Sequence, residues 1–260
     1  MRVTLPRVVH AEWTKLRGLR STWIVLAATA VIVLGLAAAA AFAQHRHVAQ
    51  GGRPPTTAEA VGGALLGIDL MSLVIGVFGV LLMTGEYGTG LIRATLAAVP
   101  RRLPVLWAKA ITLVVLALPV IAAACLGALL ASRAFLGADG PSLGEPGVLR
   151  AGLGAAAAAV GTGLLGLSIG AMVRHTAGAI TTLVAATMVV PALLPFVLPS
   201  SIQDDVIRFV PTAAGQAMYA MDSSSNPFPM LSPGNGAVVL ALWVAALLAG
   251  GAVVLQRRDA

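Results

Sequence analysis

The stretch AITLVVLALPVIAAACLGALLA, Ala110 to Ala131, contains no charged residue and no alternation of apolar and polar side chains. A helix needs roughly 20 mostly apolar residues to cross a hydrocarbon core about 30 Å thick. A helix also satisfies its own backbone polar groups, as lipid requires. The run is about twice as long as a strand of a transmembrane barrel. The stretch therefore predicts a membrane-spanning helix.

Further stretches of the chain share this length and character. Hydrophobic residues make up 58% of the 260 residues and charged residues only 10%, which excludes a water-facing globule of this size. We therefore predict an all-α integral membrane protein with six transmembrane helices, built as a single transmembrane domain over residues 1–260. The five other predicted spans are Thr22 to Ala43, Val61 to Thr84, Ala151 to Val173, Ala177 to Leu198 and Gly236 to Leu255.

The first span also has features of a cleavable signal. Basic residues precede it, and residues 41–43 read AFA, which is typical of a cleavage site. The apolar run is longer than the roughly 7 to 15 residues of a signal, and alanine is common throughout this chain. We expect the segment to be retained as an anchored helix.

The distribution of basic residues predicts the orientation. The N-terminal tail, the loops after the second and fourth spans, and the C-terminal tail hold most of the 17 Lys and Arg residues. Because such residues concentrate on the cytoplasmic side, both termini are predicted to be cytoplasmic in a multi-pass membrane protein. The basic residues left on the opposite side are Arg46, Arg53, Arg133, Arg150 and Arg208.

Residues 1–21 are predicted to form a helix lying at the membrane interface. Trp13 suits the headgroup boundary, and the basic side chains can meet anionic lipid. Glu12 falls on the apolar face. It is expected either to pair with Lys15 one turn on or to meet a cationic group on another segment or subunit. The apolar arc of this helix consists of Leu5, Val8, Val9, Trp13, Leu16 and Leu19.

Residues 85–109 contain a second short amphipathic unit. A helix can begin near Gly88 or Thr89, and Pro100 ends it. Because a ten-residue helix is marginally stable alone, it must pack on the membrane surface, on the ends of the spans or on a partner. Its apolar side is Leu91, Ile92, Thr95, Leu96 and Val99.

The segment 199–235 is too long for a simple connection. We predict two short helices that re-enter the outer leaflet, with Pro211 between them. Pro191 and Pro195 are expected to kink or fray the outer end of the fifth span.

The sequence lacks the motifs of several catalytic classes. It has no P-loop, no HExxH and no GxSxG, so it binds no ATP through a P-loop. Its one cysteine, Cys125, lies inside a span, which leaves no disulfide or thiol metal site. We predict no catalytic and no metal-binding residue.

Asp69 is the single ionisable residue well inside a predicted span. A carboxylate at the bilayer centre costs about 2.5 to 3.5 kcal/mol on insertion scales, so it usually faces a cavity or a partner. Asp69 is therefore a candidate for a cargo path or an interface. The alternatives are that it reaches outer water or is protonated.

Three segments, in this order along the spans, resemble a known family. They are AEWTKLRGLRSTW (Ala11 to Trp23), GEYGTGLIRATLAAVPRRLPVLWAK (Gly85 to Lys109) and RFVPTAAGQAMYA (Arg208 to Ala220). The chain resembles the permease subunits of bacterial ATP-binding-cassette exporters of the six-helix "ABC type two" kind.

The resemblance implies a part for each segment. Residues 1–21 would be the interfacial connecting helix, residues 85–109 the cytoplasmic coupling loop with its coupling helix, and residues 199–235 the re-entrant outer segment. Glu86, Tyr87 and Arg93, with Glu12 nearby, would contact a separate P-loop ATPase subunit that binds ATP and Mg. A second permease subunit, identical or related, would complete the exporter.

Two other functions remain open from the sequence. A stand-alone secondary carrier or channel would work without an ATPase, but one acid is few for ion coupling. A membrane-embedded enzyme would need converging catalytic groups within the spans. The cargo is expected to be apolar or amphipathic, and no nucleic-acid partner is expected.

Overall fold

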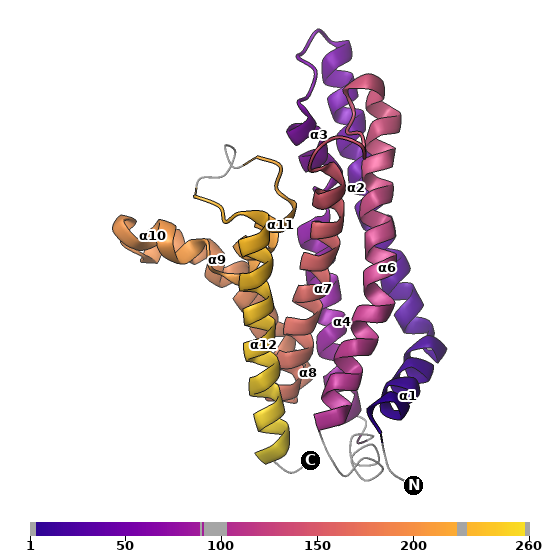
Figure 1. Cartoon of the computed structure of the whole chain (residues 1–260), viewed down its shortest axis with the longest axis vertical. Helices are drawn as coiled ribbons and strands as arrows, with labels where there is room; N and C mark the ends of the chain where they lie inside the picture. The colour runs from indigo at the N-terminus through magenta and orange to yellow at the C-terminus, as the bar shows by residue number, and fades with distance from the viewer. Residues whose placement is uncertain (1–3, 89, 91–102, 223–227, 258–260) are drawn as a thin grey trace.

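The protein is entirely helical over the residues that the structure describes, with no strand among them. The structure is a computed structural model, and it describes residues 4–88, 90, 103–222 and 228–257. The helices run roughly along the long axis of the molecule as a bundle (Figure 1). The predicted coupling helix, with Arg93, lies outside the described residues.

Six helical segments are long and apolar enough to cross a membrane, which confirms the six predicted spans. Each begins before its predicted start, and the second is divided by a turn at residues 65–67. The fifth contains a π-helical segment. The spans consist of α2 (Arg20–Ala49); α3 (Thr57–Ala64) with α4 (Ile68–Gly88); α6 (Leu103–Leu136) with the short 3-10 helix Gly137–Asp139; α7 (Val148–Val173); α8 (Thr176–Val184), the π segment Ala185–Val189 and α9 (Val190–Val197); and α12 (Pro233–Arg257).

Helix α7 lies at the centre of the bundle, where it packs against α4, α6 and α12. Its contact with α4 is made through glycines. A Cβ built on Gly79 would stand 2.0 Å from the carbonyl oxygen of Gly163, and one built on Gly166 would stand 2.0 Å from that of Gly76. The two backbones are therefore as close as a bare glycine surface permits, as is common between helices in lipid.

The fifth span loses regular α-helical geometry where its prolines begin. The π segment Ala185–Val189 directly precedes Pro191, and Pro195 lies inside α9. Proline has no N–H to donate to the preceding turn, so an irregular turn at this place has a clear cause. In Figure 1, α9 and the following α10 (Ser200–Ile207) leave the bundle sideways. The predicted distortion of the outer half is confirmed.

Two short helices precede the last span, as predicted: α10 and α11 (Pro211–Tyr219). Pro211 separates them by beginning α11. Both lie near mid-height along the axis in Figure 1, well below the α2–α3 connection. Helix α11 packs against α7 and α12.

The N-terminal helix α1 (Leu5–Gly18) is distinct from the first span. Leu19 is extended and separates it from α2. Helix α1 packs mainly against the start of α6. Figure 1 shows α1, the start of α6 and the end of α12 at one end of the bundle, here called the base, with the α2–α3 and α6–α7 connections at the other end.

Candidate functional site

Four charged side chains meet at the base of the bundle. Lys109 Nζ lies 2.9 Å from Glu12 Oε2 and 2.6 Å from Glu86 Oε1. Lys15 Nζ lies 2.9 Å from Glu12 Oε1 and 2.5 Å from Glu86 Oε1. We call these four residues, Glu12, Lys15, Glu86 and Lys109, the base cluster. Both expectations for Glu12 hold together, because it pairs with Lys15 on its own helix and with Lys109 on another segment.

Three helices bring the base cluster together. Glu12 and Lys15 are one turn apart on α1, Glu86 is in the last turns of α4, and Lys109 is near the start of α6. Residues 89–102 join α4 to α6 along the chain, so Glu86 and Lys109 stand on either side of this segment. The base cluster therefore ties both ends of this segment to α1.

Three of the four side chains are buried. Lys109 exposes 3% of its side chain, Glu12 5% and Glu86 8%, whereas Lys15 exposes 33%. Buried charges are costly unless they are paired and hydrogen-bonded, and here each acid meets both lysines. Partial burial opposes the charge of Lys15, but the hydrogen bonds that its ammonium donates to Glu86 and Glu12 outweigh this effect, so the pKa of Lys15 is raised above its usual value.

Tyr87 lies beside the base cluster and contacts a different segment. The guanidinium of Arg174 stands 5.3 Å from the centroid of the Tyr87 ring, within the range of a cation–π contact. Arg174 also donates to the carbonyl of Val254 in α12 at 3.0 Å. The end of α4 is thus connected to the α7–α8 junction and to the last helix.

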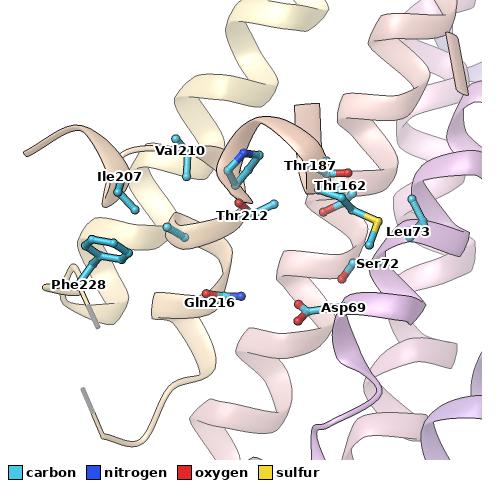
Figure 2. Close-up of a pocket in the computed structure, with 13 residues that line it drawn as sticks. Asp69, Ser72, Leu73, Thr162, Thr187, Ile207, Val210, Thr212, Gln216 and Phe228 are labelled. Carbon is cyan, nitrogen blue, oxygen red and sulfur yellow. The ribbon is translucent and has the colours of Figure 1, made fainter. Parts of the chain in front are cut away.

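Asp69 lies at a second place, in a pocket of about 340 Å³. Figure 2 shows its carboxylate and the amide of Gln216 approaching each other from α4 and α11. The side chain of Thr187 reaches the pocket from the π segment. The Asp69 pocket therefore joins three separate parts of the chain. Its full lining is Asp69, Ser72, Leu73, Thr162, Thr187, Met188, Pro191, Ile207, Val210, Thr212, Ala213, Gln216 and Phe228.

Tyr219 is the closest polar neighbour of Asp69. Its hydroxyl lies 3.4 Å from the Asp69 carboxylate. Burial raises the pKa of the Tyr219 phenol, and the nearby Asp69 charge raises it further, so Tyr219 stays protonated and donates. Arg150 holds the end of α11 by donating to the carbonyls of Met218 at 2.9 Å and Ala220 at 3.0 Å. This contact positions both Tyr219 and Gln216.

The structure brings Glu12, Glu86 and Tyr87 to the base and leaves Asp69 far from them along the bundle (Figure 1). Sequence reasoning missed the roles of Lys109, Arg150 and Tyr219. Lys109 had one available signal: it is one of only two lysines and begins an apolar helix. Tyr219 had no such signal, because its contact with Asp69 spans 150 residues of sequence.

The fold defines this protein as an all-helical, multi-pass membrane protein, since six helices are long and apolar enough to span. No protein-family model matches the chain, and no curated protein sequence matches it.

Proposed function

We propose that this protein is the membrane-spanning permease subunit of an ATP-binding-cassette transporter that exports an apolar or amphipathic compound. A separate P-loop ATPase subunit would hold ATP and Mg and supply the energy. The chain itself would not be an enzyme. It would sit in a bacterial plasma membrane with both termini in the cytoplasm, and a second permease subunit would complete the transporter.

The observation that supports this proposal best is the base cluster. A loop that receives force from a motor needs both of its ends attached to rigid elements, so that its movement is passed on. Here Lys109, at one end of the 85–109 region, pairs with Glu86 at the other end at 2.6 Å and with Glu12 of α1 at 2.9 Å. Movement of the loop would therefore displace α1, α4 and α6 as one body.

This geometry refines the parts proposed for individual residues. The carboxylates of Glu12 and Glu86 are buried and bonded to lysines within the chain. We therefore propose that they position the coupling loop, while Arg93 in the loop itself makes the ATPase contact. Tyr87, through Arg174, would connect the same movement to α12.

The proposed transport step is a rigid-body change of packed helices. ATP binding by the ATPase would favour one arrangement of the coupling loop, and the helices attached to it would follow. Helix α4 extends from the base cluster at Glu86 to the Asp69 pocket. Helix α4 would thus connect the base, where the ATPase would bind, with the cargo path. Helices α10 and α11 would cover this path on the outer side.

The test is ATP-dependent transport with a matched pair of charge reversals. The full chain is co-expressed with the P-loop ATPase that we expect to be encoded beside its gene, and it is purified through a tag on the chain. We expect the ATPase to co-purify, and inside-out vesicles to accumulate a hydrophobic dye only with ATP. Arg93→Glu should abolish both the co-purification of the ATPase and the ATP-dependent accumulation of the dye. Arg53→Glu, the same change at an exposed residue on the opposite side, should preserve both.

Two results would contradict the proposal. One is co-purification of equal amounts of the ATPase with wild type and with both variants, which would show that Arg93 does not contribute to the contact with the ATPase. The other is accumulation of dye under an ion gradient by the purified chain alone, which would favour the stand-alone carrier.

A further inference from the structure

Asp69 is a carboxylate at membrane depth without a cationic partner among the described residues. The span Thr57–Gly88 contains 32 residues, and at about 1.5 Å per residue Asp69 stands roughly 18 Å from its outer end. Its only polar contact within the described part of the chain is the neutral hydroxyl of Tyr219. An acid at such depth normally faces a partner or a cavity, and Asp69 faces the pocket.

Asp69 lies in the first turn of α4, where the helix dipole is favourable to an anionic group. The Tyr219 hydroxyl adds a donor to the carboxylate. Asp69 is the only acidic residue among the described residues that line the pocket.

Two threonine hydroxyls of the pocket present oxygen atoms as hydrogen-bond acceptors. The hydroxyl of Thr162 donates to Ala158 O at 3.1 Å, and that of Thr187 donates to Leu183 O at 2.8 Å. Each uses its proton on its own helix, so only oxygen lone pairs remain for a ligand. Gln216 adds a side-chain amide from the opposite wall, with its nitrogen on the side of Asp69 in Figure 2. Among the described residues that line the pocket, none is Lys, Arg or His.

Apolar residues make up most of the remaining lining, and Ser72 and Thr212 add two hydroxyls. The apolar residues include Leu73, Met188, Ile207, Val210 and Phe228. The volume of about 340 Å³ is within the range of small-molecule sites. Such a pocket suits a ligand with an apolar body and one positively charged group.

We propose that the Asp69 pocket binds an organic cation, an amphipathic molecule whose positive centre pairs with the Asp69 carboxylate. This inference rests on the proposed function, because it gives the chemical class of the cargo. The apolar walls hold the body of the cation, and the hydroxyl oxygens of Thr162 and Thr187 lie beside its charged end. Tyr219 holds the carboxylate in place.

The test measures direct binding to the full chain in the absence of any ATPase. The chain is purified in dodecyl maltoside, which has neither charge nor amine, and equilibrium dialysis measures its binding of tetraphenylphosphonium and ethidium. Tetraphenylborate, of the same shape as the first probe but opposite charge, serves as the control ligand. We expect saturable binding of the cations and none of the anion.

Three variants distinguish the effect of the Asp69 carboxylate on cation binding from an effect on folding. Asp69→Asn should weaken cation binding by about tenfold or more, because a charge-assisted contact is lost. Asp69→Glu, which keeps the charge, should bind within a few-fold of wild type. Asp139→Asn, an exposed acid in the 3-10 helix outside the pocket, should have no effect. Each variant is first checked for wild-type helicity and melting.

The proposal is overturned if the anion binds as well as the cations, if neither cation binds saturably, or if Asp69→Asn binds them like wild type. These failures leave the proposed function intact, because ATP-dependent transport is measured separately. Conversely, if the cations bind but no ATPase co-purifies with the chain, the proposed cation site stands and the proposed coupling to an ATPase is contradicted.

Discussion

At the residue scale, Lys109 determines how the base of the protein is held. It joins α6 to Glu12 of α1 and to Glu86 of α4 through one buried ammonium group. Without Lys109, Glu12 would be a buried acid paired only with the partly exposed Lys15. The pairing of Lys109 with two acids is therefore what makes the burial of both carboxylates tolerable.

Replacing Lys109 with Gln should destabilise the protein strongly. Both carboxylates stay buried while the positive charge is lost, and breaking a buried pair in this way costs about 3 kcal/mol or more. The measurement is the midpoint of thermal unfolding in detergent, followed by size-exclusion fluorescence. Arg53→Gln, which removes an exposed arginine paired with Glu59, is the control and should change little.

A double variant tests whether the effect comes from the pairing itself. Glu12→Gln together with Lys109→Gln should lose less stability than the two single changes add up to, because it leaves fewer unpaired buried charges. Simple additivity of the two losses would show that Lys109 acts by packing rather than by pairing.

At the element scale, the contact between α4 and α7 depends on glycine. A side chain at Gly166 or Gly79 would collide with backbone atoms of the facing helix, which cannot move aside as a side chain can. This contact also places Asp69 and Ser72 of α4 opposite Thr162 of α7 in the pocket. The spacing of the pocket walls is thus set by residues that do not line it.

Gly166→Ala should lower the melting midpoint and also weaken any binding in the Asp69 pocket, because α4 and α7 must separate. Gly35→Ala is the matched control: it lies inside α2, and an added Cβ there meets nothing within 4 Å. That change should be neutral or slightly stabilising, since alanine favours helix over glycine. Equal effects of the two substitutions would argue against close α4–α7 packing.

At the scale of the whole molecule, the bundle has two distinct ends. Figure 1 places α1, the α7–α8 junction and the end of α12 at the base, opposite the α6–α7 connection. The positive-inside pattern predicts that the base faces the cytoplasm. The single cysteine, Cys125, is buried in α6. Replacing it gives a chain without thiols, in which a newly introduced cysteine is the only site that a maleimide can label.

Single cysteines introduced in the Cys125→Ala background should report this orientation. With Ala138→Cys, at the end opposite the base, a membrane-impermeant maleimide should label intact cells. With His175→Cys, at the α7–α8 junction, labelling should require permeabilised cells. The reverse pattern would place the base outside and contradict the predicted coupling to a cytoplasmic ATPase.

Much of the architecture was predictable from local sequence. The six spans, the break before the first span and the distortion at Pro191 follow from apolar length and proline chemistry, which act over a few neighbouring residues. The position of Glu12 on an apolar face also indicated a cationic partner. Which lysine would provide it was not predictable, because Lys109 lies 97 residues away in the chain.

The sequence by itself determined that this is a six-span helical membrane protein, because hydrocarbon accepts long apolar segments only with their backbone groups paired internally. Only the tertiary structure decided which charges pair at the base, which glycines let α4 and α7 touch, and which residues surround Asp69. These depend on contacts between distant segments, such as Tyr219 with Asp69 across 150 residues, and such contacts exist only once the helices have packed.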